Sequence, residues 1–167
     1  MNERKGTNAM RWWRDPGTAR WAILVRLILA GVFIPEGIQK LIFPDDLGAR
    51  RFAGIGIPYP ELMGPFVGWV ELLCGVLLLV GWYARAAAVP LIVIMVVAIV
   101  STKVPILLGR DWLIFKVRDL DTYGFWSMAH ETRTDWAMLL AALFILLAGA
   151  GRWSIDAIRH RGGTYGA

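Results

Sequence analysis

The sequence predicts an all-α fold, an integral membrane four-helix up-down bundle, from its composition, its four long apolar runs and the placement of its charges. Hydrophobic residues make up 57% of the 167 residues, charged residues only 19%, and mean hydropathy is +0.53. Soluble domains are closer to half apolar and a quarter charged, so this composition is shifted toward lipid. It excludes a disordered chain, a disulfide-rich module and a soluble enzyme with a polar surface.

The apolar runs cover about residues 21–43, 62–82, 86–108 and 135–151. At a helical rise of 1.5 Å per residue, each run approaches or exceeds the hydrocarbon thickness of about 30 Å. The runs are continuous rather than alternating, which favours helices, and helices satisfy their own backbone polar groups in lipid. We therefore expect one transmembrane domain over 21–157, between a basic N-terminal tail (1–20) and a short C-terminal tail (158–167).

Four spans would place both ends of the chain on one side of the membrane. The two tails and the turn at Arg85 carry nine Lys and Arg residues, and the other two loops carry six over a longer stretch. The positive-inside rule then predicts that both termini are cytoplasmic.

The three connections differ in character. The turn at Arg85 is tight, so the second and third spans should be antiparallel neighbours. Glycine and proline in 44–61 predict a non-helical path. Residues 109–134 mix aromatic and charged side chains, which suits a segment on the outer membrane surface.

Several kinds of chemistry are excluded by residue type. Cys74 is the single cysteine, so no disulfide or CxxC redox pair can form, and we expect it to be a small buried hydrophobic residue. His130 and His160 would lie on opposite membrane sides, which excludes bis-histidine haem ligation. No zinc or other metal site is predicted, and no nucleotide-binding or nucleophile motif occurs. The basic residues form no aromatic-interleaved stripe, so no nucleic acid is expected as partner.

Ionisable residues inside the spans are the most informative feature, because each costs roughly 2.5–3.5 kcal/mol at mid-bilayer unless it is paired. Those in or beside the spans are Arg26, Glu36, Lys40, Glu71, Lys103, His130, Glu131 and Asp135. Most fall in the outer part of the bundle, with Glu71 nearer its middle.

Spacing suggests how these residues pair. Glu36 and Lys40 are four residues apart and stack on one helix face. Arg26 lies about ten residues, or roughly 15 Å, from Glu36. We therefore expect Arg26 to pair with Glu71, the other acid deep in a span, and Lys103 to pair with Asp135. Such pairs either fix helix register or line a ligand pocket, and the sequence leaves both open.

Three blocks of sequence resemble the DoxX family of small four-span membrane proteins. They are RLILAGVFIPEGIQKL (26–41), GIPYPELMGPFVGWVELLCGVLLLVGWYARAAA (56–88) and AHETRTDWAMLLAALFILLAGAGRWSIDA (129–157). The family takes its name from a membrane subunit of a thiosulfate:quinone oxidoreductase, and relatives belong to membrane-associated oxidoreductase systems. The resemblance implies a four-helix fold, a bacterial plasma membrane location, and Arg26, Lys40 and Glu71 as the matching polar positions.

The leading hypothesis is a membrane subunit of an oxidoreductase system that binds a quinone or similar lipophilic redox carrier in the outer half of the bundle. Lys40 or Lys103 would hydrogen-bond a carbonyl, and Glu36 or Glu71 would relay protons. The predicted catalytic residues are Glu36, Lys40 and Glu71, and the predicted substrate-binding residues are Arg26, Lys103, His130 and Asp135.

Electrons would come from a redox partner protein, and the other expected partner is the lipid bilayer, with a homo-oligomer as a further option. The alternative hypothesis is a non-catalytic membrane scaffold or assembly partner, in which the charges are structural and the 109–134 segment docks an extracytoplasmic or peripheral protein. A small-molecule transporter is the least favoured of the three, because the chain is short and has no internal repeat.

Overall fold

The structure is a computed structural model that describes residues 20–162, so the predicted N-terminal tail and the end of the C-terminal tail lie outside the described residues. This range is helical apart from loops and one isolated β-bridge between Trp112 and Phe115, which confirms the all-α prediction for the described part. The elements are α2 (Ala22–Ile42), α3 (Ala49–Ile55), α4 (Pro60–Val80), α5 (Ala84–Ala98), the π-helical turn η1 (Ile99–Lys103), α6 (Val104–Leu108), α7 (Phe125–Ala148) and α8 (Ile155–Gly162).

Three helical stretches are long and apolar enough to cross a membrane: α2, α4 and the continuous helix Ala84–Leu108 formed by α5, η1 and α6. Their ends agree with the first three predicted spans to within two residues. Helix α7 is equally long but extends back to Phe125, ahead of the predicted span at 135–151. Its first half carries charged residues, so the fourth membrane crossing stays a prediction.

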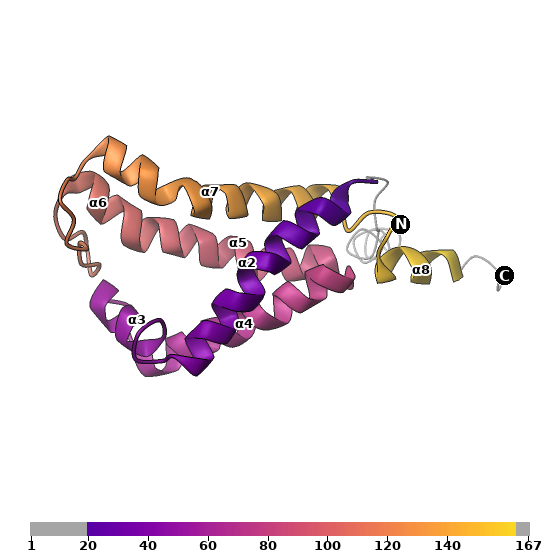
Figure 1. Ribbon diagram of the computed structural model, residues 1–167, viewed down its shortest axis with the longest axis horizontal. Coiled ribbons are helices and arrows are strands. Elements are labelled where there is room, and N and C mark those ends of the chain that lie inside the picture. The colour runs from indigo at the N-terminus through magenta and orange to yellow at the C-terminus, as the bar shows by residue number, and fades with distance from the viewer. Residues whose placement is uncertain (1–19, 163–167) are drawn as a thin grey trace, which may run out of the picture.

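The long helices pack as two pairs. Helix α2 crosses α4 in close contact, and α5 runs beside α7 (Figure 1). The turn at Gly81–Tyr83 joins α4 to α5 as antiparallel neighbours, as predicted. Helix α2 begins near the end of the assembly at which α8 lies, and α3 lies at the opposite end (Figure 1). Between the pairs, the core contains Leu29, Phe33, Leu78 and Leu91, and Cys74 is buried there too.

The predicted non-helical path over 44–61 is wrong at residues 49–55, which form α3. The helix lies between Pro44 and Pro58 and ends at Gly56, whose φ of +91° is a left-handed conformation favoured by glycine. The glycines and prolines therefore bound a short helix instead of preventing one.

Glycines allow α2 and α4 to approach closely. A Cβ on Gly37 would lie 2.6 Å from the Gly68 carbonyl oxygen and 2.6 Å from the Leu72 nitrogen. On α4, Gly68 contacts α2 and Gly64 contacts the start of α3. The GxxxG motif formed by Gly64 and Gly68 is therefore used for packing within the chain.

Gly37→Ala should destabilise the protein, because the added methyl meets backbone atoms that can move only by separating two helices. Overpacking of this kind costs about 1–3 kcal/mol, which outweighs the gain in helix propensity of about 1 kcal/mol. The check is the thermal unfolding midpoint in detergent, with Gly31→Ala on the same helix as control, since a Cβ there meets no atom within 4 Å. Equal midpoints for the two variants would contradict the close contact between helices.

At the end of the bundle near α8, buried polar side chains satisfy backbone groups where helices terminate. Arg26 donates to the carbonyls of Leu78 (2.7 Å), Leu79 (2.6 Å), Ala150 (3.1 Å) and Trp153 (2.6 Å). It thereby ties the last turn of α4 to the loop before α8. In an apolar environment such terminal carbonyls need partners, which explains why a buried arginine lies there.

Two further residues complete this end of the bundle. Arg85 donates to the carbonyls of Leu146 and Leu147 near the end of α7. The Asp156 carboxylate accepts hydrogen bonds from the backbone N–H groups of Tyr83 and Ala84 at the start of α5. The start of α8 is thus fastened to the α4–α5 turn.

The predicted Arg26–Glu71 pair is wrong. Arg26 is bonded to helix-terminal carbonyls, and Glu71 is bonded to Lys40 instead. Carboxylates are the acceptors that a sequence displays, whereas main-chain carbonyls at helix ends compete for a buried guanidinium.

Candidate functional site

A cavity of about 450 Å³ lies between the two helix pairs and beneath α3. This volume is within the usual range of small-molecule sites, about 300–1,000 Å³. Most of its wall is apolar, including Phe33, Phe52 and Met138, while its ionisable lining residues are Glu36, Lys40, Arg51, Lys103 and Asp135.

The first polar wall is a cluster of two carboxylates around one lysine. Lys40 Nζ lies 3.0 Å from Glu36 Oε2, confirming the predicted i,i+4 pair, and 2.7 Å from Glu71 Oε2. The Glu71 side chain is only 4% exposed and lies behind the lysine, whereas the Glu36 side chain is 47% exposed and lines the cavity. Glu36 is thus the carboxylate that a bound molecule would meet, and Glu71 holds Lys40 from the rear.

The cluster formed by Glu36, Lys40 and Glu71 has a formal charge of −1 when all three residues are ionised. At 2.7 Å from Glu71 Oε2, Lys40 compensates the charge of this buried carboxylate. A second cation, Arg51 of α3, lines the same cavity. The formal charges of Lys40 and Arg51 together equal those of the two carboxylates in magnitude.

The second polar wall joins η1 to α7. Lys103 Nζ lies 3.2 Å from Asp135 Oδ2, confirming the predicted pair, and both side chains are largely buried. Lys103 ends a π-helical turn in which the Val104 N–H bonds to the Ile99 carbonyl, just before Pro105, which has no N–H to donate. Single π-turns of this kind are frequent at functional sites.

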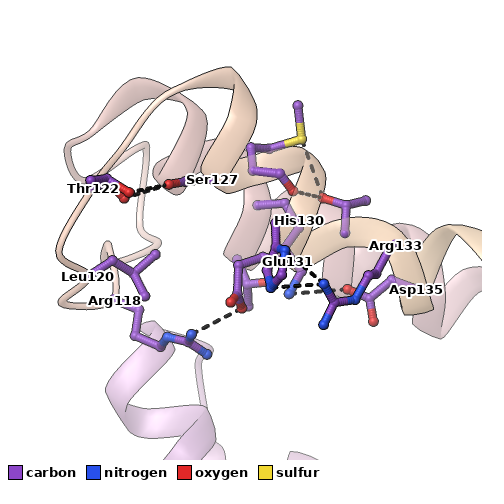
Figure 2. Close-up of polar contacts among 12 residues, drawn as sticks. Arg118, Leu120, Thr122, Ser127, His130, Glu131, Arg133 and Asp135 are labelled. Carbon is purple, nitrogen blue, oxygen red and sulfur yellow. Dashed lines mark hydrogen bonds and ion pairs between the residues drawn. The ribbon is translucent and has the colours of Figure 1, made fainter.

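His130 does not share the cavity. It is exposed near the start of α7 and contacts Arg133, and Figure 2 shows the two side chains beside each other. Glu131, the next residue, pairs with Arg118 of the preceding loop (Figure 2). His130 and Asp135 are five residues apart, which turns their side chains about 140° from one another around the helix. Only one of them can therefore face the cavity, and it is Asp135.

The structure thus brings four of the predicted site residues to one cavity: Glu36, Lys40, Lys103 and Asp135. Glu71 lies directly behind them, in contact with Lys40. Arg26 and His130 lie elsewhere, the first among helix-end carbonyls and the second on the surface.

Sequence reasoning missed α3 and its contribution to the cavity. Arg51, Phe52 and Ile55 of α3 line the cavity, whereas the sequence predicts a non-helical path there. The signal was present in ARRFAGI, a helix-compatible stretch with Phe52 and Ile55 three residues apart on one face. In the sequence, Arg50 and Arg51 bear only on the prediction of membrane topology.

The cavity wall formed by α4 and α5 includes exposed apolar side chains: Phe66, Val93 and Val97 are 57%, 55% and 47% exposed. They belong to helices that are long and apolar enough to span a membrane, so in a bilayer these side chains would meet acyl chains. A lipophilic molecule could reach this wall from the bilayer without passing through water.

Comparisons with known proteins indicate the family of this chain. The DoxX family profile matches residues 21–104, about half of the chain. An uncharacterized membrane protein of Mycobacterium tuberculosis is 47% identical over 134 residues, which cover 80% of this chain and 78% of the relative. No solved structure gives a significant match. Both the profile and the relative identify a membrane protein, and the chain belongs to the DoxX family.

Proposed function

We propose that this protein is the membrane subunit of an oxidoreductase system and that it binds a quinone, or a similar lipophilic carrier, in the cavity between the helix pairs. The observation that carries the proposal is the cavity itself. It is largely apolar, includes exposed apolar side chains on its α4–α5 wall, and has ion pairs on two walls. An isoprenoid-type tail would suit the apolar wall at Phe66, and a polar head would suit the interior.

The charges favour a neutral head group. The six ionisable residues in or directly behind the cavity wall are Glu36, Lys40, Arg51, Glu71, Lys103 and Asp135, and their formal charges sum to zero. An ionised ligand would add an uncompensated charge to a site of low polarity, which is costly. A quinone head is neutral and carries two carbonyl acceptors, so it fits donors placed on separate walls.

Each polar residue then has a distinct task. Lys103, whose ammonium uses one contact on Asp135, is placed to donate to a carbonyl oxygen. Glu36, the exposed carboxylate, is placed to hold or pass a proton at the cavity wall. Glu71 positions Lys40 from behind. A quinone supplies two-electron, two-proton chemistry when bound.

The sequence carries no motif for a redox centre of its own, so a partner protein would deliver the electrons. We place the chain in a bacterial plasma membrane with both termini cytoplasmic. Support comes from the excess of Lys and Arg in the tails, the bacterial relative, and the position of α8 at the end of the assembly where α2 begins (Figure 1).

Binding of decylubiquinone to the purified protein in nanodiscs tests the proposal. Lys103→Met should weaken binding about tenfold, the equivalent of one hydrogen bond to a charged donor. Lys116→Met, which removes an exposed lysine outside the cavity, should leave the affinity unchanged. The double variant Lys103→Met/Asp135→Asn avoids an unpaired carboxylate and should bind as weakly as the single one.

Mass spectrometry of lipids extracted from the wild-type protein gives an independent readout, in which a co-purifying quinone is expected. No quinone in the extract together with no saturable decylubiquinone binding would overturn the proposal.

A further inference from the structure

The cations that line the cavity differ in how many of their N–H donors are already engaged. Lys40 has three, and two of them face Glu36 and Glu71. Lys103 has three, and one faces Asp135. The Arg51 guanidinium has five N–H donors and makes no hydrogen bond or ion pair with any residue between 20 and 162. The largest free donor capacity in the wall therefore belongs to Arg51.

Helix α3 holds Arg51 over the cavity from two fixed ends. At its start, Gly64 of α4 packs so closely that a Cβ there would lie 2.8 Å from the Ala49 nitrogen. At its end, the Ile55 carbonyl accepts a hydrogen bond from the Lys116 N–H at 2.8 Å. The helix is thus held by both α4 and the 109–124 connection, and Phe52 and Ile55 face the cavity with Arg51.

Arg51 is exposed and also lines the cavity, so its side chain lies at the mouth of the cavity. Its neighbour Arg50 is also exposed on the same helix, but it does not line the cavity. The two adjacent arginines thus have different surroundings, although the sequence presents them as equivalent.

We infer that Arg51 is a ligand-contacting, specificity-determining residue, whose guanidinium donates hydrogen bonds to a carbonyl oxygen on the head of the lipophilic carrier. This inference rests on the proposed function. The cluster formed by Glu36, Lys40 and Glu71 attracts the guanidinium and keeps it at the mouth of the cavity, while Phe52 packs beside the ligand head. Arg51 and Lys103, which lie on separate elements, then each donate a hydrogen bond to one of two acceptor oxygens on the same molecule.

The test compares Arg51→Gln with Arg50→Gln in nanodiscs, using decylubiquinone and decylbenzene as paired probes. The first probe has carbonyl oxygens, and the second has the same alkyl tail without them. Arg51→Gln should weaken decylubiquinone binding about tenfold and leave decylbenzene binding unchanged. Arg50→Gln should change neither affinity. Both residues are exposed, so both variants should keep the wild-type unfolding temperature.

The outcomes separate this inference from the proposed function. If the wild type binds decylubiquinone with the expected dependence on Lys103 but Arg51→Gln binds equally well, the role of Arg51 is overturned and the proposed function stands. If Arg50→Gln and Arg51→Gln weaken decylubiquinone binding equally, the effect comes from surface charge alone, and the role of Arg51 is again overturned. If the wild type binds no quinone at all, both proposals fall.

Discussion

Replacing Arg26 with methionine is expected to lower the stability of the protein more than any other single change at the end of the bundle near α8. Arg26 is 2% exposed and donates to four main-chain carbonyls on two separate segments. Each hydrogen bond to a charged group contributes about 1.5–3 kcal/mol, partly offset by the cost of burying the guanidinium. A net loss of about 3 kcal/mol or more follows, read as a lower unfolding temperature in detergent.

Two further variants make this result specific. Arg26→Lys should recover little, because one ammonium cannot reproduce the planar fork that reaches carbonyls of both α4 and the loop before α8. Arg152→Met removes an exposed arginine from that loop and should change the unfolding temperature by less than about 2 °C. If Arg26→Met and Arg152→Met unfold at the same temperature, the carbonyl contacts do not hold this end together.

Features encoded locally could be predicted from the sequence. Continuous hydropathy located α2, α4 and the Ala84–Leu108 helix, because lipid requires apolar length and that length is visible in one dimension. The Glu36–Lys40 contact followed from i,i+4 spacing alone. The Lys103–Asp135 contact spans two helices, and it was predictable because both charges lie at the same depth.

Features that depend on packing or on the main chain were not predictable in the same way. In the sequence, any acidic residue of the bundle is a possible partner for Arg26. The carbonyls that bind it can be identified only when the positions of α4 and of the loop before α8 are known. Asp135 and His130 are close in sequence, yet helical phase sends them to different faces. To predict that Arg51 lines the cavity, one must know that residues 49–55 form α3 and which face of that helix meets the cavity.

Replacing Lys40 with methionine should produce the second large effect, now at the candidate site. Lys40 is the only cation in direct contact with Glu71 among the described residues, and it also contacts Glu36. Removing one partner of a buried ion pair costs about 3–5 kcal/mol, chiefly because the remaining charge is left without compensation. We expect Lys40→Met to unfold at a temperature lower by several degrees, as monitored by intrinsic tryptophan fluorescence in detergent.

The double variant Lys40→Met/Glu71→Gln should recover most of that stability, because it removes the orphaned charge along with its partner. Lys40→Met/Glu36→Gln should recover much less, since the Glu36 side chain is 47% exposed and solvent or headgroups already stabilise its charge. This asymmetry distinguishes a carboxylate that anchors Lys40 from one that faces the cavity. Equal rescue by the two Gln substitutions would mean that both carboxylates share one environment. The assignment of Glu36 to the ligand side would then fail, and with it the division of tasks within the site.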